Sequence, residues 1–433
     1  MLSLLCGVIA YIIAFTFFEG CYRYFRAKAT NRKRLAPKVN KLGKPFRSTR
    51  LRMLLLLIYS VVCPTQRGET QTGATAPLAM PSTSGVITTA SPKIVNAGPL
   101  GNIDVTGILS GFGYSQNHPS AGDRITLGDV SNGQVFVQKA SGLFQYFLQA
   151  GVYNIPILGI PGISTRATVD SFYGPLPQAY LKIAPKDNFS FLIGKLPTLI
   201  GAEYTFSFEN LNIERGILWN QENAISRGIQ INYGKDKFTG SLSWNDGFYS
   251  NRYNWLSGTV TYSLNQQNTL QVTGGGNLGN TPYSTTATPL YQNNGSIYNV
   301  IYTYTAKRWM LEPYFQYTRV PANLNIGTSH NSSTIGSAVI ANYNFTSHIS
   351  LAERGEYIAS TGDARDGAAN LLYGAGSQAW SITLTPTFHD NAFFVRGEFS
   401  FSHANNQTPG DVFGPEGINP AQVRGLVETG LMF

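Results

Sequence analysis

The sequence predicts an all-β fold, a transmembrane up-and-down antiparallel β-barrel of about 16 strands with long loops at one end and short turns at the other. Charged residues make up only 13% of the 433 residues, about half the fraction in an ordinary soluble domain. From about residue 101 onward, apolar and polar side chains alternate along successive segments, which is typical of strands. Short and long connections also alternate between these segments. A regular separation of turns from loops is typical of outer-membrane barrels.

The net charge of +9 is unevenly distributed along the chain. Thirteen of the 32 basic residues lie in residues 1–67, against one of the 23 acidic residues, so the remainder carries −3. Basic charge confined to a leader gives no reason to expect a nucleic-acid partner.

The first hundred residues predict export. Residues 1–18 are apolar, and a second apolar run, Met53–Val62, follows a basic stretch in the order of a signal peptide. We predict that residues 1–67 are a leader, in which an upstream extension precedes a signal peptide that starts near Val39. The alternative is that 1–18 form a real membrane helix. Residues 68–100, rich in Thr, Ser, Ala and Pro, are predicted to be flexible, and 101–433 to form the barrel.

The composition gives no indication of catalysis, metal binding or a cofactor. All three cysteines lie in the first 63 residues, and the five histidines are scattered without ligand spacing. The run Gly274–Gly279 matches a dinucleotide-binding pattern, but it opens no helix and no βαβ unit surrounds it. We therefore expect neither enzyme activity nor a cofactor.

The alternation defines the strands in order. In the segment 391–403, for example, Phe393, Val395 and Phe399 alternate with Arg396 and Glu398, which places one set on each face of the sheet. The sixteen predicted strands span residues 102–115, 131–139, 144–153, 178–184, 188–195, 228–233, 237–245, 255–263, 267–277, 296–305, 308–319, 335–345, 348–360, 379–388, 391–403 and 422–433.

One strand departs from clean alternation. Glu353 and Arg354 are adjacent in the segment 348–360, so a bulge or a twist near the rim is expected there.

The connections give the barrel its direction. Seven of them are short, and each joins an even-numbered predicted strand to the next odd one, while the others are long and rich in Gly, Asn, Pro and Ser. Short turns lie on the periplasmic side of such barrels and long loops outside. Because lipid offers no hydrogen-bond partners, every backbone group must be paired within the protein, and a closed barrel achieves this. The predicted location is the Gram-negative outer membrane, with its lipids as partners; in the alternative, the aromatic residues at strand ends form the core of a soluble β-protein.

The last strand carries an assembly feature. The chain ends in Phe433, with Val423, Val427 and Leu431 at alternate positions before it. This pattern resembles the recognition signal by which barrel-assembly machinery binds the C-terminal strand of outer-membrane barrels.

The segment Phe191–Gly234 resembles the OmpL-like β-barrel porin family of Gram-negative outer membranes. The Gly-Lys-Leu-Pro-Thr run, the Asn210–Arg215 stretch and Ser226-Arg227-Gly228 carry the similarity, and Ser243-Trp244-Asn245-Asp246-Gly247 adds to it. The resemblance implies a porin-like barrel and passive passage of solutes, without naming a substrate.

The third long loop, residues 196–227, is the predicted pore constriction. A barrel of this strand number leaves an aqueous lumen, and in general porins the third loop folds inward to narrow it. Four acids against two bases favour cations mildly; in the alternative, these charges pair with one another on an ordered loop. The constriction candidates are Glu203, Glu209, Glu214, Arg215, Glu222 and Arg227, and the wall candidates are Lys182, Arg396, Glu398, Arg424 and Glu428.

The predicted function is that of an outer-membrane porin for passive diffusion of small hydrophilic solutes or ions. A homotrimer is the expectation from general porins of this strand number. The alternative is a structural or adhesion-type barrel without a conducting pore, and an outer-membrane enzyme such as a lipase is a third hypothesis.

Overall fold

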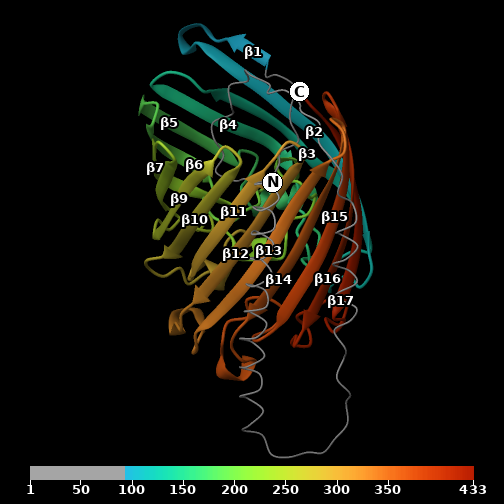
Figure 1. Ribbon diagram of the computed structural model, residues 1–433. Coiled ribbons are helices and arrows are strands. Elements are labelled where there is room, and N and C mark those ends of the chain that lie inside the picture. The colour runs from blue at the N-terminus through green and yellow to red at the C-terminus, as the bar shows by residue number, and fades with distance from the viewer. Residues whose placement is uncertain (1–92) are drawn as a thin grey trace, which may run out of the picture. The chain divides into compact units, whose positions relative to one another are not determined.

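The computed structural model describes residues 93–433. The predicted leader, 1–67, and the part of the flexible segment before residue 93 lie outside the described residues. Sixteen antiparallel strands follow one another in chain order and close into a barrel (Figure 1), which confirms the predicted fold class. They are β2 Asn102–Gln116, β3 Thr126–Lys139, β4 Phe144–Tyr153, β5 Gln178–Lys186, β6 Phe189–Pro197, β7 Ile225–Lys235, β8 Phe238–Asn245, β9 Trp255–Asn265, β10 Asn268–Asn277, β11 Ser296–Thr305, β12 Trp309–Val320, β13 Ser332–Asn344, β14 Ile349–Ser360, β15 Gln378–Asp390, β16 Phe393–Asn405 and β17 Ala421–Met432.

Pairing of the last strand with the first closes the barrel. β17 runs antiparallel to β2, from Arg424 opposite Gln116 to Met432 opposite Ile108. The backbone of Phe433 then exchanges hydrogen bonds of 2.6 and 2.9 Å with Gly107. The ring of Phe433 covers Gly107, and a Cβ there would lie 2.6 Å from its Cζ, so a larger side chain would displace the ring.

A short strand extends the wall beyond the C-terminus. β1, Lys93–Asn96, pairs with the start of β2, Asn102–Val105, which β17 does not reach. Figure 1 shows β1 and the C-terminus at the same end of the barrel. Residues 93–96, which fall in the predicted flexible segment, therefore protect the free edge of β2.

The connections follow the predicted alternation. Seven turns of two to four residues join β3–β4, β5–β6, β7–β8, β9–β10, β11–β12, β13–β14 and β15–β16, and the remaining connections are long. β4 and β11 have the predicted bounds. β3 begins at Thr126, five positions before its predicted start at 131, because Ser131 bulges out of the β2–β3 ladder and interrupts the alternation.

The two faces of the sheet are reversed relative to a soluble β-protein. Leu242, Val260 and Val272 point outward with 52%, 55% and 53% of their surfaces exposed, whereas Thr259 and Gln271, on the opposite face, are buried. The apolar surface thus faces hydrocarbon and the polar surface faces the lumen.

The bulge predicted at Glu353 and Arg354 is absent. The β13–β14 ladder runs without interruption, with Ala341 opposite Glu353 and Ile340 opposite Arg354. The two charges therefore lie on opposite faces: Arg354 points into the barrel, and Glu353 points outward near the periplasmic end of β14. Proximity to the rim brings the outward carboxylate close to water, so the strand needs no extra residue.

Among residues 93–433, helical structure is confined to short segments of the loops. The helices α3, Thr165–Ser171, and α4, Leu290–Asn293, belong to two of the long loops, and five 3-10 turns accompany them. Within residues 93–433, no helix has both the length and the apolar character of a membrane span.

The outward face generates a test of the membrane orientation. Val272→Lys places a charge on the lipid-facing surface and is expected to lower the free energy of unfolding by about 2–4 kcal/mol. Gln271→Lys, the matched control, places the same charge on the lumenal face and is expected to cost far less. Urea unfolding in lipid vesicles, followed by tryptophan fluorescence, measures both variants. Equal losses of unfolding free energy in the two variants would contradict the assignment of Val272 to the lipid-facing surface and Gln271 to the lumenal surface.

Candidate functional site

The candidate site is the third long loop, residues 198–224, which folds into the barrel. It is shorter than the predicted 196–227, because β6 extends to Pro197 and β7 begins at Ile225. Nearly all of its side chains are buried. Two 3-10 turns, η4 Ser207–Glu209 and η5 Leu218–Gln221, shape it.

Apolar side chains of the loop pack against the inner surface of the wall. Phe206 contacts the ring of Tyr153, with 5.1 Å between centroids. Ile217 and Leu218 belong to a buried cluster that includes Ile301 of β11. This part of the lumen is therefore occupied by a packed core rather than by water.

Three strands supply charged side chains to the inner wall. Their alternation points an arginine and a glutamate inward from each of β14, β16 and β17. We call these six residues, all at most 5% exposed, the loop anchor: Arg354, Glu356, Arg396, Glu398, Arg424 and Glu428.

The glutamates of the loop anchor accept hydrogen bonds from the loop. Glu398 accepts from the backbone N–H groups of Ile213 and Glu214, at 2.5 and 2.9 Å. Glu356 accepts from those of Ile217 and Leu218, at 3.0 and 3.1 Å. Two carboxylates thus satisfy four amides that would otherwise be buried without partners.

Glu428 completes the set of acceptors. Its carboxylate accepts from the Ser207 hydroxyl at 2.8 Å and forms an ion pair with Arg396 at 2.5 Å. It therefore joins η4 to β16 and β17.

The arginines of the loop anchor bind the acidic side chains and carbonyl groups of the loop. Arg354 donates to the Glu203 carboxylate at 2.6 Å and to the Glu214 carbonyl at 2.7 Å. Arg396 donates to the carbonyls of Asn210 and Ser207, at 2.9 and 2.8 Å.

Arg424 connects the second long loop, residues 154–177 between β4 and β5, to the same network. Its guanidinium pairs with the Glu214 carboxylate and donates to the carbonyls of Ile157 and Ile160. The backbone of Arg215 also bonds to that loop, since its N–H donates to the Pro156 carbonyl and its carbonyl accepts from Leu158, both at 2.9 Å.

Close approach of loop and wall requires glycine at one position. A Cβ on Gly216 would lie 2.1 Å from an oxygen of Glu356 and 2.8 Å from one of Glu203. Any larger side chain would force the loop away from β14.

Five of the six predicted constriction residues lie in loop 198–224, and three of them are held by ion pairs or hydrogen bonds of their charged groups. Glu203 and Glu214 form ion pairs with Arg354 and Arg424. Arg215 is fully buried, and its guanidinium donates to carbonyls of Thr205, Asn212 and Ile213 within the loop. Glu203 and Glu214 thus pair with arginines of the wall rather than with the basic residues of the loop.

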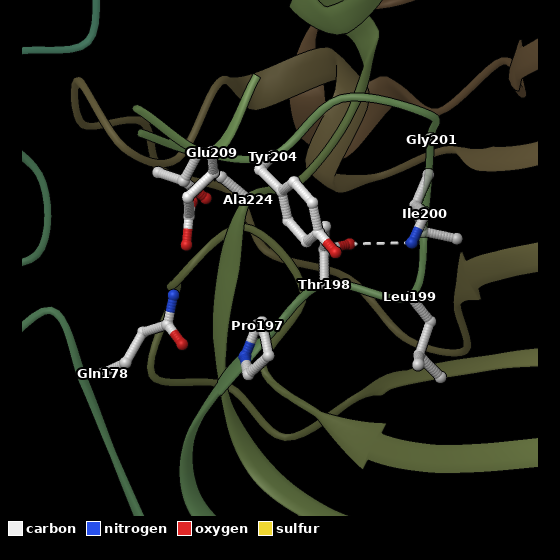
Figure 2. A pocket seen from close by; sticks show the side chains of 10 residues that line it. Gln178, Pro197, Thr198, Leu199, Ile200, Gly201, Tyr204, Glu209 and Ala224 are labelled. Atoms are coloured by element: carbon white, nitrogen blue, oxygen red, sulfur yellow. Dashed lines mark hydrogen bonds between the residues drawn. The ribbon is translucent and has the colours of Figure 1, made fainter. Parts of the chain in front are cut away.

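Glu209 closes a small pocket at the base of the loop. Figure 2 shows its carboxylate directed toward Gln178 of β5, with Tyr204 beside it. One carboxylate oxygen accepts from the Phe206 N–H at 3.1 Å. Burial raises the pKa of the Glu209 carboxyl to about 8, against the opposing effects of that hydrogen bond and of Arg215. The group is therefore mostly protonated at neutral pH.

Glu222 is also buried, between the loop and β12. Neither of its carboxylate oxygens has a hydrogen-bond partner among the described residues. Burial raises the pKa of Glu222 well above its usual range, and Glu203 and Glu356 add to the rise. Burial therefore favours the neutral form of this carboxyl.

The sixth predicted residue, Arg227, does not belong to the constriction. It lies in β7, on the face opposite Gln230, which lines the lumen. Its guanidinium pairs with Asp246 at 2.7 Å and lies over the Tyr249 ring, 3.9 Å from its centroid. The error came from placing the end of the loop at residue 227, two positions inside the strand.

The predicted wall residues divide into two groups. Arg396, Glu398, Arg424 and Glu428 point inward and hold the loop, as described above. Lys182 points inward from β5, away from the loop, and lines two cavities of about 500 and 480 Å³ near the periplasmic turns.

Sequence reasoning missed two members of the loop anchor, Arg354 and Glu356. Their spacing repeats that of Arg396 and Glu398 in another strand, and this repetition was the available indication. Within residues 93–433, no cluster of three or more His, Cys, Asp or Glu side chains is suited to hold a metal ion.

The chain forms a closed barrel with an apolar exterior, and its third long loop folds inward. These features together define a porin-type protein of the outer membrane. The chain belongs to the family described as "Putative beta-barrel porin-2, OmpL-like", which matches residues 102–433. Family membership confirms the predicted resemblance and places the protein in the Gram-negative outer membrane. No curated protein matches the chain in sequence.

Solved structures share the fold at low sequence identity. An anion-selective porin from Comamonas acidovorans is 10% identical with a TM-score of 0.55, over 76% of this chain and 99% of that one. Outer-membrane-expressed OmpT of Vibrio cholerae is 12% identical with a TM-score of 0.53, over 78% and 100%. The trimer form of in-vitro folded OmpT is 13% identical with a TM-score of 0.50, over 76% and 99%.

The loop anchor generates a test of how the loop is held. Glu398→Ala removes the acceptor for two buried amides, each such bond to a charged group contributing about 1.5–3 kcal/mol. We expect the loop to loosen and trypsin to cleave after Arg215, whose side chain is fully buried in the intact protein. Mass spectrometry of the fragments identifies that cut.

Ser402→Ala is the matched control, because Ser402 lies on the inward face of the same strand and its hydroxyl has no partner among the described residues. The Ser402→Ala protein should resist trypsin cleavage after Arg215. A Glu398→Ala protein that resists cleavage there would show that the carboxylate does not hold the loop.

Proposed function

We propose that the protein is a passive channel for small hydrophilic solutes or ions, and that loop 198–224 narrows it. The observation that carries the proposal is the fixed position of the loop against β14, β16 and β17, which leaves the cavities lined by β5 to β10 on the other side of the lumen. The solute path follows that side.

The chemistry of the two sides supports this division. The inward charges of β14, β16 and β17 are bound by the loop or by one another, and apolar packing excludes water there. Inward side chains of β7 to β10 carry amides and hydroxyls, among them Gln230, Asn232, Thr261 and Gln271. Such groups donate and accept hydrogen bonds, so they replace part of the hydration shell of a passing polar solute.

We also propose that this channel acts without catalysis. The carboxylates of the loop anchor are committed to backbone amides, hydroxyls or arginines. Membership of a porin family also favours transport over catalysis.

We propose a homotrimer, as expected for porins with this number of strands. One of the structural relatives is described as a trimer form. A monomeric mass for the protein extracted in mild detergent would contradict the assembly.

The channel proposal is tested by planar-bilayer recording. Wild-type protein is expected to give stepwise currents. Replacing residues 203–221 by a short Gly-Ser linker removes the buried loop from the lumen, and the conductance is expected to rise roughly twofold or more, since a sixteen-stranded wall encloses an aqueous bore.

Leu324→Ser is the control, because Leu324 is 83% exposed in the β12–β13 loop. Its conductance should equal that of the wild type. Silence of wild-type and loop-replaced protein alike, with folding verified by heat-dependent gel migration, would favour the structural or adhesion-type barrel. An unchanged conductance after loop replacement would reject the constriction.

The C-terminal strand carries a separate proposal, recognition by barrel-assembly machinery. Phe433 is 57% exposed and ends the strand that closes the barrel. Removing Phe433 is expected to lower the amount of folded barrel in the outer membrane, measured by its heat-dependent gel band. Unchanged amounts would contradict a role in recognition.

A further inference from the structure

The lumen is asymmetric in its charge. Arginines and glutamates crowd the inner faces of β14, β16 and β17, where all six are buried and engaged. On the inward faces of the described strands β4 to β10, away from the periplasmic turns, Lys182 is the one charged side chain, since Lys195, Arg227 and Lys235 fall on the outward face by alternation.

Lys182 faces open space rather than a partner. It lines both of the cavities near the periplasmic turns, with Ser190 and Asp187. Among the described residues its ammonium has no ion pair and no hydrogen bond, and its surroundings on the wall are neutral, with Gln145 on β4 and Gln230 on β7.

Asp187 is the acidic residue among those that line the two cavities. It belongs to the β5–β6 turn and is exposed, as is its neighbour Lys186, so the two turn charges offset each other at the mouth. Water and salt screen charges at the mouth more than those inside the wall.

We propose that Lys182 sets the ion preference of the channel and makes it favour small anions. The inference rests on the proposed function, since only a conducting lumen has an ion preference. An uncompensated charge on a low-dielectric wall focuses its field into the lumen and raises the local concentration of the opposite ion.

This inference reverses the preference for cations expected from the loop. That expectation counted Glu203, Glu209, Glu214 and Glu222 as facing water. Two of the four are paired with arginines and all four are at most 5% exposed. None of the four lines the open cavities, where Lys182 is the charged side chain of the inner wall, so Lys182 determines the sign there.

Reversal potentials in a potassium chloride gradient across a planar bilayer test the proposal. The wild type and Lys182→Arg, which keeps the charge, are expected to favour chloride. Lys182→Gln is expected to lose the preference, and Lys182→Glu to favour potassium. Lys235→Gln, a change at an exposed outward lysine, is the matched control and should behave as the wild type.

The outcomes separate the two proposals. Absence of current from folded wild-type protein overturns the channel and, with it, the role of Lys182. Currents that favour chloride equally in the wild type and in Lys182→Gln overturn the role of Lys182 alone, as does a wild type that favours potassium. Lys182→Gln nearly preserves the side-chain volume, so a folding failure of Lys182→Glu leaves the comparison decisive.

Discussion

Hydrocarbon offers no hydrogen-bond partner to a peptide group, so each strand that crosses it must be paired on both sides. The β2–β17 ladder satisfies this condition, and it extends to the last residue through the backbone bonds between Phe433 and Gly107. The same constraint reverses the usual distribution of side chains. Apolar residues such as Val260 and Val272 face outward, and the polar residues collect inside, where their charges need partners.

The inner charges explain why the third loop lies inside the barrel. A buried carboxylate or guanidinium is costly unless it is paired and fully hydrogen-bonded. Glu356 and Glu398 find backbone amides of the loop, while Arg354 and Arg396 find its carbonyls and Glu203. The loop in turn buries its aromatic and aliphatic side chains. Wall and loop thus stabilise each other. The open part of the lumen lies beside β5 to β10, whose inner faces carry few charges.

This division of the lumen has a consequence for transport. In the channel that we propose, the charges that hold the loop are screened from the solute path, and a solute meets amides, hydroxyls and one lysine instead. A count of the charges in loop 198–224 is therefore a poor guide to the ion preference of that channel, because position and pairing decide which charges reach water. Glu209 and Glu222 illustrate the point, since burial raises the pKa of each carboxyl and favours its neutral form.

The sequence by itself determined the local pattern: sixteen strands, the face on which each side chain lies, the order of turns and loops, and the inward direction of Arg396, Glu398, Arg424, Glu428 and Lys182. These follow from alternation, which is a property of neighbouring residues. Only the tertiary structure decided which charges meet. Arg354 reaches Glu203 across 151 positions and Arg424 reaches Glu214 across 210, while Arg227 lies outside the lumen. Such pairings depend on the path of the loop through space, and alternation carries no information about that path.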